Sequence, residues 1–290
     1  MNEYGKVFEK ASLKKYSSFG IGGTVKYLVF PQNIEQLEKL VKYLKDKKIK
    51  YFVLGNCTNV IIDDDYFDGV VIKLDDINEI TINDNEVVAS AGVNLPFLVS
   101  KCIDNGLTSL YFASMIPGNV GGSIVGNAGC FGHELMEYVK DVTVMDKDGN
   151  IKRMNKDEIS FGYRYTSLKD KYIVLSVTFI LEKGNVEEIK KEIKEKNEKR
   201  IASQPLDKKN VGSIFRNPEG FIAGKLIDDL KLKGYMIGGA KISEKHANFI
   251  VNEKNASFND VINLIDFIKE KVKENYDINL VVEPTIIRWK

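Results

Sequence analysis

The sequence has few of the residues on which metal sites and hydrolytic triads depend. Two histidines and three cysteines occur among 290 residues, and Cys57, Cys102 and Cys130 lack the spacing of metal ligands. We therefore expect no metal site, and nothing in the composition supports a Ser-His-Asp triad. An odd number of cysteines favours free thiols in a reducing cytoplasm.

Long apolar runs and an excess of charge are also missing. The segment 1–10 is charged and has no apolar core of a signal peptide, and no stretch is long enough to span a bilayer, so we expect no membrane partner. The 42 basic and 41 acidic residues nearly cancel, which argues against a nucleic-acid partner. At this length two or three domains are expected. No internal repeat or low-complexity segment is visible.

Glycine, by contrast, is concentrated in one segment. Six of the 23 glycines fall within the 15 positions from 118 to 132, and no Lys, Glu or Asp occurs between Ile116 and His133. Such a density supplies positive-φ conformations and bare N–H groups that can approach a ligand closely. The sequence therefore favours a loop wrapped around a nucleotide pyrophosphate. The alternative is a glycine-rich surface connection without a ligand.

A second loop of small residues follows the predicted strand Tyr51–Leu54. Its residues are Gly55, Asn56, Cys57, Thr58 and Asn59, whose amides and hydroxyls suit diphosphate oxygens. The loop lacks the Lys-Ser/Thr ending of a P-loop and does not open a helix as G-x-G-x-x-G does. Alone it would be a plain turn, but two such loops in one chain favour a dinucleotide.

Hydrophobic periodicity predicts an α+β protein. Helices are expected over 33–44 and 94–105, from Asn185 as a charged, solvated helix, and from Ser257. The expected strands are Val25–Phe30, Tyr51–Leu54, Val70–Leu74, Glu86–Ser90, Val139–Met145, Tyr172–Leu181, Ser213–Arg216, Asn248–Val251 and Leu280–Ile287. Asp148-Gly149 predicts a hairpin turn, and Arg200–Asp207 is the most plausible linker. The elements do not alternate strictly as βαβ units.

Two motifs contain candidate catalytic residues, an arginine between two tyrosines and a serine close to two lysines. In F-G-Y-R-Y-T-S, Arg164 lies between Tyr163 and Tyr165 and would aim a stacked guanidinium at a carboxylate or a flavin ring. The alternative, to which we give equal weight, is that Arg164 lies on the surface and only covers the neighbouring aromatic rings. Ser213 follows two lysines, and neighbouring cations or a water relay would equip it as a proton donor. An isolated Ser at a strand edge would otherwise be the commoner interpretation.

The C-terminal third carries candidate substrate contacts. The segment 220–252 contains Lys225 and His246, which would suit phosphates, although a lone histidine is more often structural. Glu283 lies in an apolar strand, where burying a lone carboxylate is costly unless it is paired or functional. Pro284 marks a strand edge or end, where such a carboxylate would face a cleft.

Read together, the segments from about Ser17 to the C-terminus resemble the UDP-N-acetylenolpyruvoylglucosamine reductase family of the peptidoglycan pathway. The matching pieces are S-F-G-I-G-G, L-G-N-C-T-N-V-I-I-D-D, I-P-G-N-V-G-G-S-I-V-G-N-A-G, F-G-Y-R-Y-T-S, G-S-I-F-R-N-P and L-K-G-Y-M-I-G-G-A-K-I-S-E-K-H-A-N-F-I-V-N. The resemblance implies an FAD-binding fold of the vanillyl-alcohol-oxidase type. Two FAD-binding subdomains are expected at 1–75 and 76–203, the second joined by a C-terminal strand at 279–290, with a substrate domain at 204–278.

The resemblance also implies a reaction. NADPH reduces FAD, and flavin N5 then delivers hydride to the vinyl carbon of UDP-N-acetylglucosamine enolpyruvate, which gives UDP-N-acetylmuramate. Arg164 and Glu283 match the residues that stabilise the enol, and Ser213 matches the proton donor. FAD is expected at Gly55, Asn56, Cys57, Thr58, Asn59, Pro117, Gly118, Asn119, Gly121, Gly122, Ser123 and Asn127. The UDP-sugar is expected at Tyr163, Asn217, Lys225 and His246.

The sequence leaves several points open. Aligned without gaps on Leu280, the acid is Glu283, whereas an alternative register puts Thr285 at that position. The short connection before G-S-I-F-R-N-P resembles the shorter family subtype, which lacks a tyrosine-bearing loop over the substrate. An FAD-dependent sugar or alcohol oxidase and a non-catalytic flavin- or UDP-sugar-binding protein are the alternative functions. The expected protein is a cytoplasmic monomer whose partners are small molecules.

Overall fold

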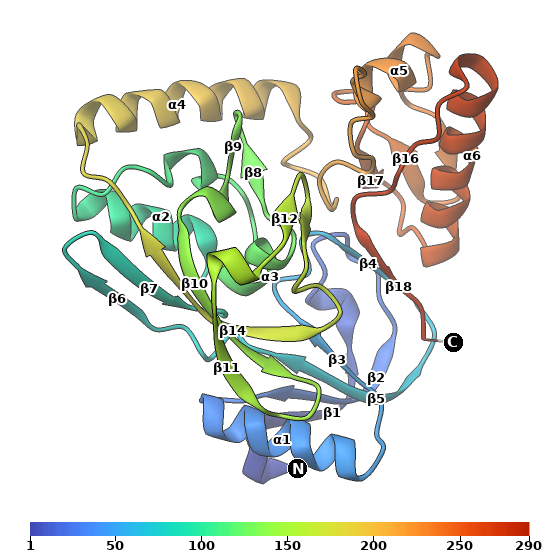
Figure 1. Cartoon of the computed structure of the whole chain (residues 1–290). Coiled ribbons are helices and arrows are strands. Elements are labelled where there is room, and N and C mark those ends of the chain that lie inside the picture. The colour runs from blue at the N-terminus through green and yellow to red at the C-terminus, as the bar shows by residue number, and fades with distance from the viewer. Residues whose placement is uncertain (290) are drawn as a thin grey trace. The chain divides into compact units, whose positions relative to one another are not determined.

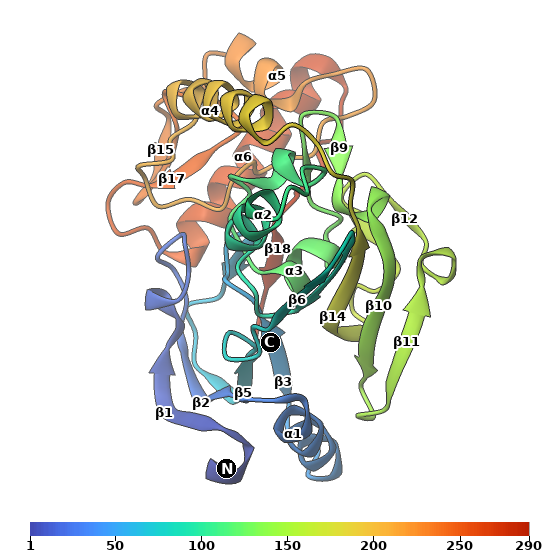
Figure 2. The same cartoon turned by 90° about the vertical axis from the view of Figure 1, so that its left-hand side faces the viewer.

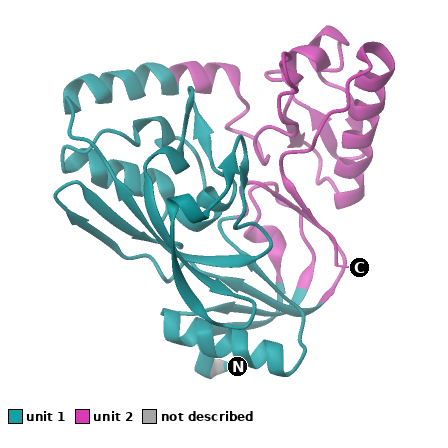
Figure 3. Ribbon diagram, in the orientation of Figure 1, with its two compact units in different colours: residues 1–11, 25–56, 68–197 teal, residues 12–24, 57–67, 198–290 magenta. Residues whose placement is uncertain are grey.

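The computed structural model describes residues 1–289, so Lys290, at the end of the expected C-terminal strand segment, lies outside it (Figure 1). The chain divides into two compact units (Figure 3). Unit 1 comprises Met1–Ala11, Val25–Asn56 and Asp68–Asn197, and unit 2 comprises Ser12–Thr24, Cys57–Phe67 and Glu198–Lys290. Each unit has its own apolar core and mixes helices with sheets, which confirms the α+β class.

The first sheet of unit 1 shares its core with an amphipathic helix that has an N-terminal cap. Its strands lie in the order β1 (Lys6–Ser12), β2 (Thr24–Phe30), β5 (Phe67–Lys73) and β3 (Tyr51–Leu54). Helix α1 (Ile34–Asp46) begins at Asn33, whose side chain accepts a hydrogen bond from the Gln36 amide. Its apolar face is fully buried in the same core as the sheet, through Leu37, Leu40, Val41 and Leu44.

The second sheet of unit 1 is entirely antiparallel. Its order is β11 (Ile151–Asn155), β10 (Val139–Asp146), β14 (Tyr172–Ile180), β7 (Glu86–Ser90) and β6 (Ile80–Asn83). Met145 pairs with Ile151, so the predicted hairpin turn at Asp148-Gly149 is confirmed. Helices α2 (Leu95–Asp104) and α3 (Val120–Val125) lie on the same side of this sheet (Figure 2).

Two short hairpins and a long helix complete unit 1. The hairpins are β8 (Gly129–Cys130) with β9 (His133–Glu134), and β12 (Phe161–Gly162) with β13 (Tyr165–Thr166). Helix α4 (Val186–Ser203) has no buried residue, as its charge pattern predicts, and it runs from unit 1 into unit 2. The predicted linker therefore begins too early, because residues 200–203 are still helical. Short 3-10 helices occur at Asn2–Tyr4, Leu13–Lys15, Tyr111–Ala113, Leu135–Glu137 and Lys156–Glu158.

Unit 2 packs two helices with short strands. Strand β4 (Val60–Ile62) pairs in parallel with β18 (Thr285–Ile287), and β15 (Met236–Ile237), β16 (Ala240–Ile242) and β17 (Ile250–Asn252) form a small sheet. Helices α5 (Ala223–Asp229) and α6 (Phe258–Tyr276) belong to the same core. The predicted apolar stripe of α6 is buried at Val261, Leu264, Ile265, Ile268 and Val272.

Two strand predictions are wrong for identifiable reasons. Residues 213–216 form no strand, because the Asn248 side chain takes both the N–H and the C=O of Phe215, and only an isolated bridge from Phe215 to Val282 remains. The C-terminal strand starts at Thr285, after Pro284, which has no N–H to donate. It pairs with β4 instead of joining residues 76–203 as expected. The three domain boundaries themselves stay a prediction.

The start of α6 offers a direct test of this local structure. Ser257 and Asp260 form a reciprocal capping box, in which the Ser257 hydroxyl accepts from the Asp260 amide at 3.1 Å. Replacing Ser257 with Ala should lower the free energy of unfolding by about 1 kcal/mol, measured by urea denaturation. Ser257→Asn, which keeps an acceptor, is the control. An Ala variant as stable as the wild type would contradict this account of the cap.

Candidate functional site

The middle of the glycine-rich segment, Val120–Val125, folds into the short helix α3 instead of an open loop. The amides of Val120 and Gly121 donate to the carbonyls of Val93 and Ala91 at 2.8 and 2.9 Å. The Ser123 amide donates to the Asn119 carbonyl. The expectation of bare amides is therefore wrong at these three positions. Gly121 instead permits close packing, since a Cβ there would lie 2.8 Å from the Ala91 Cβ.

Asn119, at the start of α3, contributes a buried polar atom to a cavity. Its Nδ2 donates to the Gly92 carbonyl at 2.5 Å, which fixes which amide atom is the oxygen. Among the residues described, nothing hydrogen-bonds to its buried Oδ1. The cavity, of about 370 Å³, is lined by Asn56, Asp75, Asn78, Gly92, Val93, Asn94, Phe97 and Asn119.

The polar groups of this cavity can be compared with the groups that FAD offers. A carbonyl-type oxygen repels phosphate but accepts from a hydroxyl or an N–H, so Asn119 Oδ1 suits a sugar or ribityl hydroxyl or a ring N–H. Asn56 and Asn94 line the same cavity and offer further amide groups. The residues present therefore fit a large polar cofactor, and an unsatisfied buried acceptor is the group that such a ligand would satisfy.

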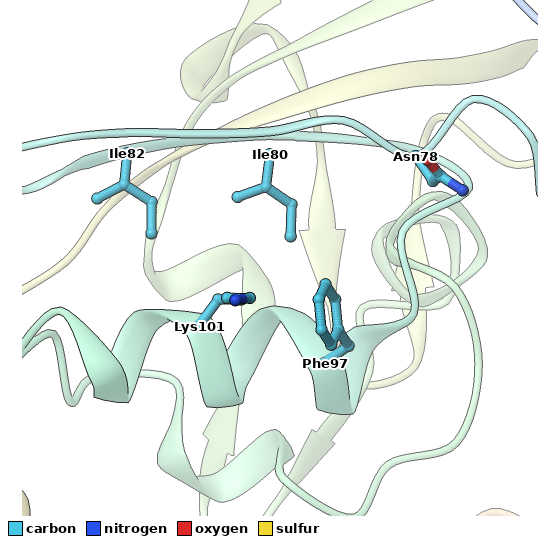
Figure 4. A pocket seen from close by; sticks show the side chains of 5 residues that line it. All are labelled: Asn78, Ile80, Ile82, Phe97 and Lys101. Atoms are coloured by element: carbon cyan, nitrogen blue, oxygen red, sulfur yellow. The ribbon is translucent and has the colours of Figure 1, made fainter.

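A second hollow of about 390 Å³ adjoins the first. It is lined by Asn78, Ile80, Ile82, Phe97 and Lys101, so Asn78 and Phe97 line both cavities. Figure 4 shows Phe97 and Lys101 on α2 facing Ile80 and Ile82 of β6, with Asn78 beyond the end of that strand. The Lys101 ammonium lies 5.4 Å from the centroid of the Phe97 ring. This hollow therefore offers one aromatic face and one cation beside apolar side chains.

Sequence reasoning missed Lys73, which holds the loop at Gly55. Lys73 is only 3% exposed, and its ammonium donates to the Gly55 carbonyl at 2.5 Å and pairs with Asp75 at 3.3 Å. A lone cation at the end of the apolar strand Val70–Leu74 was the signal that could have found it, because a buried lysine needs partners. Lys73 thereby ties the first residue of the small-residue loop to β5.

The rest of that loop is held within unit 2. The Cys57 carbonyl accepts from the Ser18 amide and hydroxyl at 3.3 and 3.1 Å, and Cys57 has a positive φ of 52°. The Asn59 carbonyl accepts from the Thr285 amide at 3.0 Å. The loop backbone is therefore fixed on both sides, and Thr285 lies beside this loop.

Arg164 sits in the turn of the β12–β13 hairpin in unit 1. It has a φ of 57°, and its guanidinium carbon lies 4.9 Å from the centroid of the Tyr163 ring, as stacking predicts. Its Nη2 donates to the Gly129 carbonyl at 2.7 Å, and its Nη1 lies 3.7 Å from Glu134 Oε1. The side chain is 22% exposed, so it is not the surface arginine of the alternative interpretation.

Ser213 and Glu283 come together in unit 2. The Glu283 amide donates to the carbonyl of Ile214, the residue after Ser213, at 2.8 Å. The Ile214 amide in turn donates to the Asn248 carbonyl at 2.8 Å. Ser213 is half-buried on this doubly fixed backbone, and Glu283 is the candidate acid that lies next to it.

The three expected substrate contacts of unit 2 all have structural partners. Asn217 Oδ1 accepts from the Ala223 amide at the start of α5, and Lys225 pairs with Asp229 at 3.1 Å on an exposed helix face. His246 Nδ1 accepts from the Asn248 amide at 3.2 Å. Burial, then the charge of Lys233, lowers the pKa of His246, so its neutral form is favoured. This geometry favours the structural interpretation of His246.

Three further features of the described residues concern metal ligands, apolar helices and thiols. Residues 1–289 contain no cluster of three or more His, Cys, Asp or Glu side chains that could hold a metal ion. Among the helices that the structure describes, none is both long and apolar enough to cross a bilayer. Cys57, Cys102 and Cys130 are free thiols, and burial raises the pKa of Cys102 to about 12, so this thiol is unreactive at neutral pH.

Two family models match different parts of the chain, and curated relatives match nearly all of it. The family model "UDP-N-acetylenolpyruvoylglucosamine reductase, C-terminal domain" matches residues 204–287, and an FAD binding domain model matches residues 25–155. A UDP-N-acetylenolpyruvoylglucosamine reductase of Caldanaerobacter subterraneus subsp. tengcongensis is 43% identical over 99% of this chain and 95% of its own length. One from Limosilactobacillus reuteri is 41% identical over 99% of this chain and 97% of its own.

A solved structure of a protein with the same name is similar to this chain in both sequence and fold. The crystal structure of UDP-N-acetylenolpyruvylglucosamine reductase from Thermus caldophilus is 32% identical in sequence and has a TM-score of 0.82. The match covers 98% of each chain. Together with the FAD binding domain match, it confirms the expected FAD-binding fold.

Two adjacent glycines of α3 test whether packing or ligand approach dictates this segment. Gly121→Ala should lower the free energy of unfolding of the flavin-free protein by about 1–3 kcal/mol, because its Cβ would meet Ala91. Gly122→Ala, whose Cβ would meet nothing within 4 Å, should leave stability unchanged or raise it by less than about 1 kcal/mol. Urea unfolding followed by circular dichroism measures both. Equal losses in the two variants would contradict the packing argument.

Proposed function

Because the chain belongs to the UDP-N-acetylenolpyruvoylglucosamine reductase family, we propose that it reduces UDP-N-acetylglucosamine enolpyruvate to UDP-N-acetylmuramate with NADPH and FAD. The observation that carries the proposal is the similarity over nearly the whole chain to reductases of this name. Such a reaction supplies a peptidoglycan precursor. The buried, unsatisfied Asn119 Oδ1 in a polar cavity adds independent support for a large cofactor.

The proposed FAD contacts come from the two small-residue segments. Asn56 and Asn119 line the cavity, and the other proposed contacts are Gly55, Cys57, Thr58, Asn59, Pro117, Gly118, Gly121, Gly122 and Ser123. Asn127 would act only indirectly, because its side chain is fully buried and bonded to other protein groups. Not all of these contribute in the same way. Gly121 acts by letting α3 approach Ala91, whereas Asn119 offers a buried side-chain oxygen that accepts no hydrogen bond from the described residues.

When bound, FAD supplies the hydride that it has taken from NADPH, and the protein supplies charge and a proton. Addition of hydride to the vinyl carbon pushes electrons toward the substrate carboxylate. A fixed guanidinium stabilises charge that develops only in the transition state, and we assign this role to Arg164. Its stacking on Tyr163 and its bond to the Gly129 carbonyl hold it in one orientation before substrate binds. Glu283 shares the stabilisation of the enol form.

Ser213 is the proposed proton donor. Reduction of the double bond needs one hydride at the vinyl carbon and one proton at the α-carbon, and a positioned hydroxyl delivers that proton. The backbone that follows Ser213 is held by Asn248 and by the Glu283 amide, which fixes where the Ser213 side chain begins. Because Glu283 adjoins this segment while Thr285 lies beside Asn59, the geometry supports Glu283 as the acid.

We further propose that the protein works as a cytoplasmic monomer. Free cysteines suit a reducing compartment. Its partners are then the nucleotide cofactors and the UDP-sugar, which would contact Tyr163, Asn217, Lys225 and His246. Asn217, Lys225 and His246 already have protein partners, which a substrate would share or displace.

A product assay tests the proposed activity. Incubation of the FAD-loaded protein with NADPH and the enolpyruvyl sugar should yield a product heavier by one hydride and one proton, detected by mass spectrometry. A parallel incubation with polyols and oxygen tests for the oxidase alternative. Turnover of a polyol without reduction of the enolpyruvyl sugar would overturn the proposal in favour of that oxidase.

Ser213→Ala separates the two half-reactions. Reduction of bound FAD by NADPH should be unchanged, because that step needs no proton from Ser213. Reoxidation by the enolpyruvyl sugar should slow by about 100- to 10,000-fold, the range for loss of a general acid. Anaerobic stopped-flow absorbance of the flavin measures both rates. Comparable slowing of both half-reactions would remove Ser213 from its assigned role.

A further inference from the structure

A buried asparagine organises the segment behind Arg164. Asn127 is 0% exposed, and its side-chain amide is used completely: Nδ2 donates to Glu134 Oε2 at 2.7 Å and to the Gly162 carbonyl at 2.9 Å. Its Oδ1 accepts from the Met136 amide at 3.1 Å. Asn127 also has a positive φ of 42°, which asparagine tolerates better than most residues. It thereby links the carboxylate of Glu134 to the hairpin that carries Arg164.

The Glu134 carboxylate cannot swing away from this position. It is held by Asn127 and also accepts the N3 amide of the following 3-10 turn, in a reciprocal capping box with Glu137. One of its oxygens lies 3.7 Å from Arg164 Nη1, and both side chains are mostly shielded from water, at 26% and 22% exposure. An ion pair that is partly withdrawn from solvent is screened less than a surface pair.

Both anchors of the guanidinium come from one small hairpin. Gly129, whose carbonyl accepts from Arg164 Nη2 at 2.7 Å, is the strand partner of Glu134. The Arg164 turn is also tied down by the Thr166 hydroxyl, which donates to the Val125 carbonyl at 2.8 Å. A guanidinium has five N–H donors in a planar fork. The Gly129 carbonyl and the Glu134 carboxylate together restrict the orientation of this planar group.

We propose that Glu134 is a positioning residue, which fixes the orientation of the Arg164 guanidinium toward the substrate carboxylate. This inference rests on the proposed function, because it requires Arg164 to act on the enolpyruvyl group. Glu134 acts on the reaction only through the guanidinium that it contacts. Its contribution is the preorganisation of a long, flexible side chain, and misplacement of a catalytic group lowers the rate steeply.

The first test compares Glu134→Gln with the matched control Glu137→Gln, a change in the same capping box that leaves the Arg164 pair intact. E134Q should slow flavin reoxidation by the enolpyruvyl sugar by about 10- to 100-fold. Flavin reduction by NADPH, FAD content and the thermal midpoint should match those of E137Q. Reoxidation in E134Q within about twofold of E137Q would overturn the inference, and so would equal slowing of both half-reactions.

Chemical rescue tests orientation directly. Arg164→Gly removes the guanidinium while keeping the turn, because glycine adopts a φ of 57° without strain. Added guanidinium ion should restore part of the reoxidation rate in R164G, since Glu134 and the Gly129 carbonyl remain in place to bind it. In the double variant R164G/E134Q, rescue should need about 10-fold more guanidinium. Equal rescue in the two variants would contradict the role of Glu134.

The wild type separates this inference from the function on which it rests. If wild-type flavin is not reoxidised by the enolpyruvyl sugar, the proposed function itself falls. If the wild type is reoxidised and E134Q behaves like E137Q, only the positioning role falls.

Discussion

The close approach of α3 to the backbone of residues 91–93 is the contact on which the candidate site depends. The amides of Val120 and Gly121 bond to the carbonyls of Val93 and Ala91, and Gly121 has no Cβ to hold the helix away. At its start, the helix brings Asn119 into the cavity beside Gly92. Beyond its end lies Asn127, which holds the Arg164 hairpin. One packing contact therefore orders both the proposed cofactor cavity and a proposed catalytic side chain.

The sequence predicts the parts of the fold that follow from periodicity and turn chemistry. Helices α1 and α6 are predictable because their apolar residues recur with the helical period and their capping residues are local signals, and the structure buries both stripes. Helix α3 is not predictable, because its two glycines and absence of charge oppose helix propensity, and tertiary packing overrides propensity there. The segment at Ser213 reads as a strand, but the side chain of a distant residue, Asn248, takes the backbone bonds that a strand would have used.

In the candidate site too, local motifs are predictable from the sequence and tertiary contacts are not. Arg164, Ser213 and Glu283 were named from motifs, because chemistry restricts which residue types can occur there. The sequence does not point to Glu134, which contacts Arg164, or to Lys73, which holds the loop at Gly55, because both act through contacts that sequence spacing does not reveal. Within unit 1, Arg164 is oriented by the β8–β9 hairpin. Within unit 2, Ser213 lies on backbone fixed by Asn248 and Glu283. The Arg164 side chain and the backbone at Ser213 are thus each held in place by their own surroundings before a substrate binds.

The most direct test of the account is anaerobic absorbance of the purified, FAD-loaded protein as NADPH and then UDP-N-acetylglucosamine enolpyruvate are added. The account predicts that NADPH bleaches the flavin band and that the enolpyruvyl sugar restores it. A flavin that bleaches but does not recover would contradict the assigned substrate. A protein that binds no FAD, even after reconstitution, would contradict the cofactor site built around Asn119 and with it the central claim.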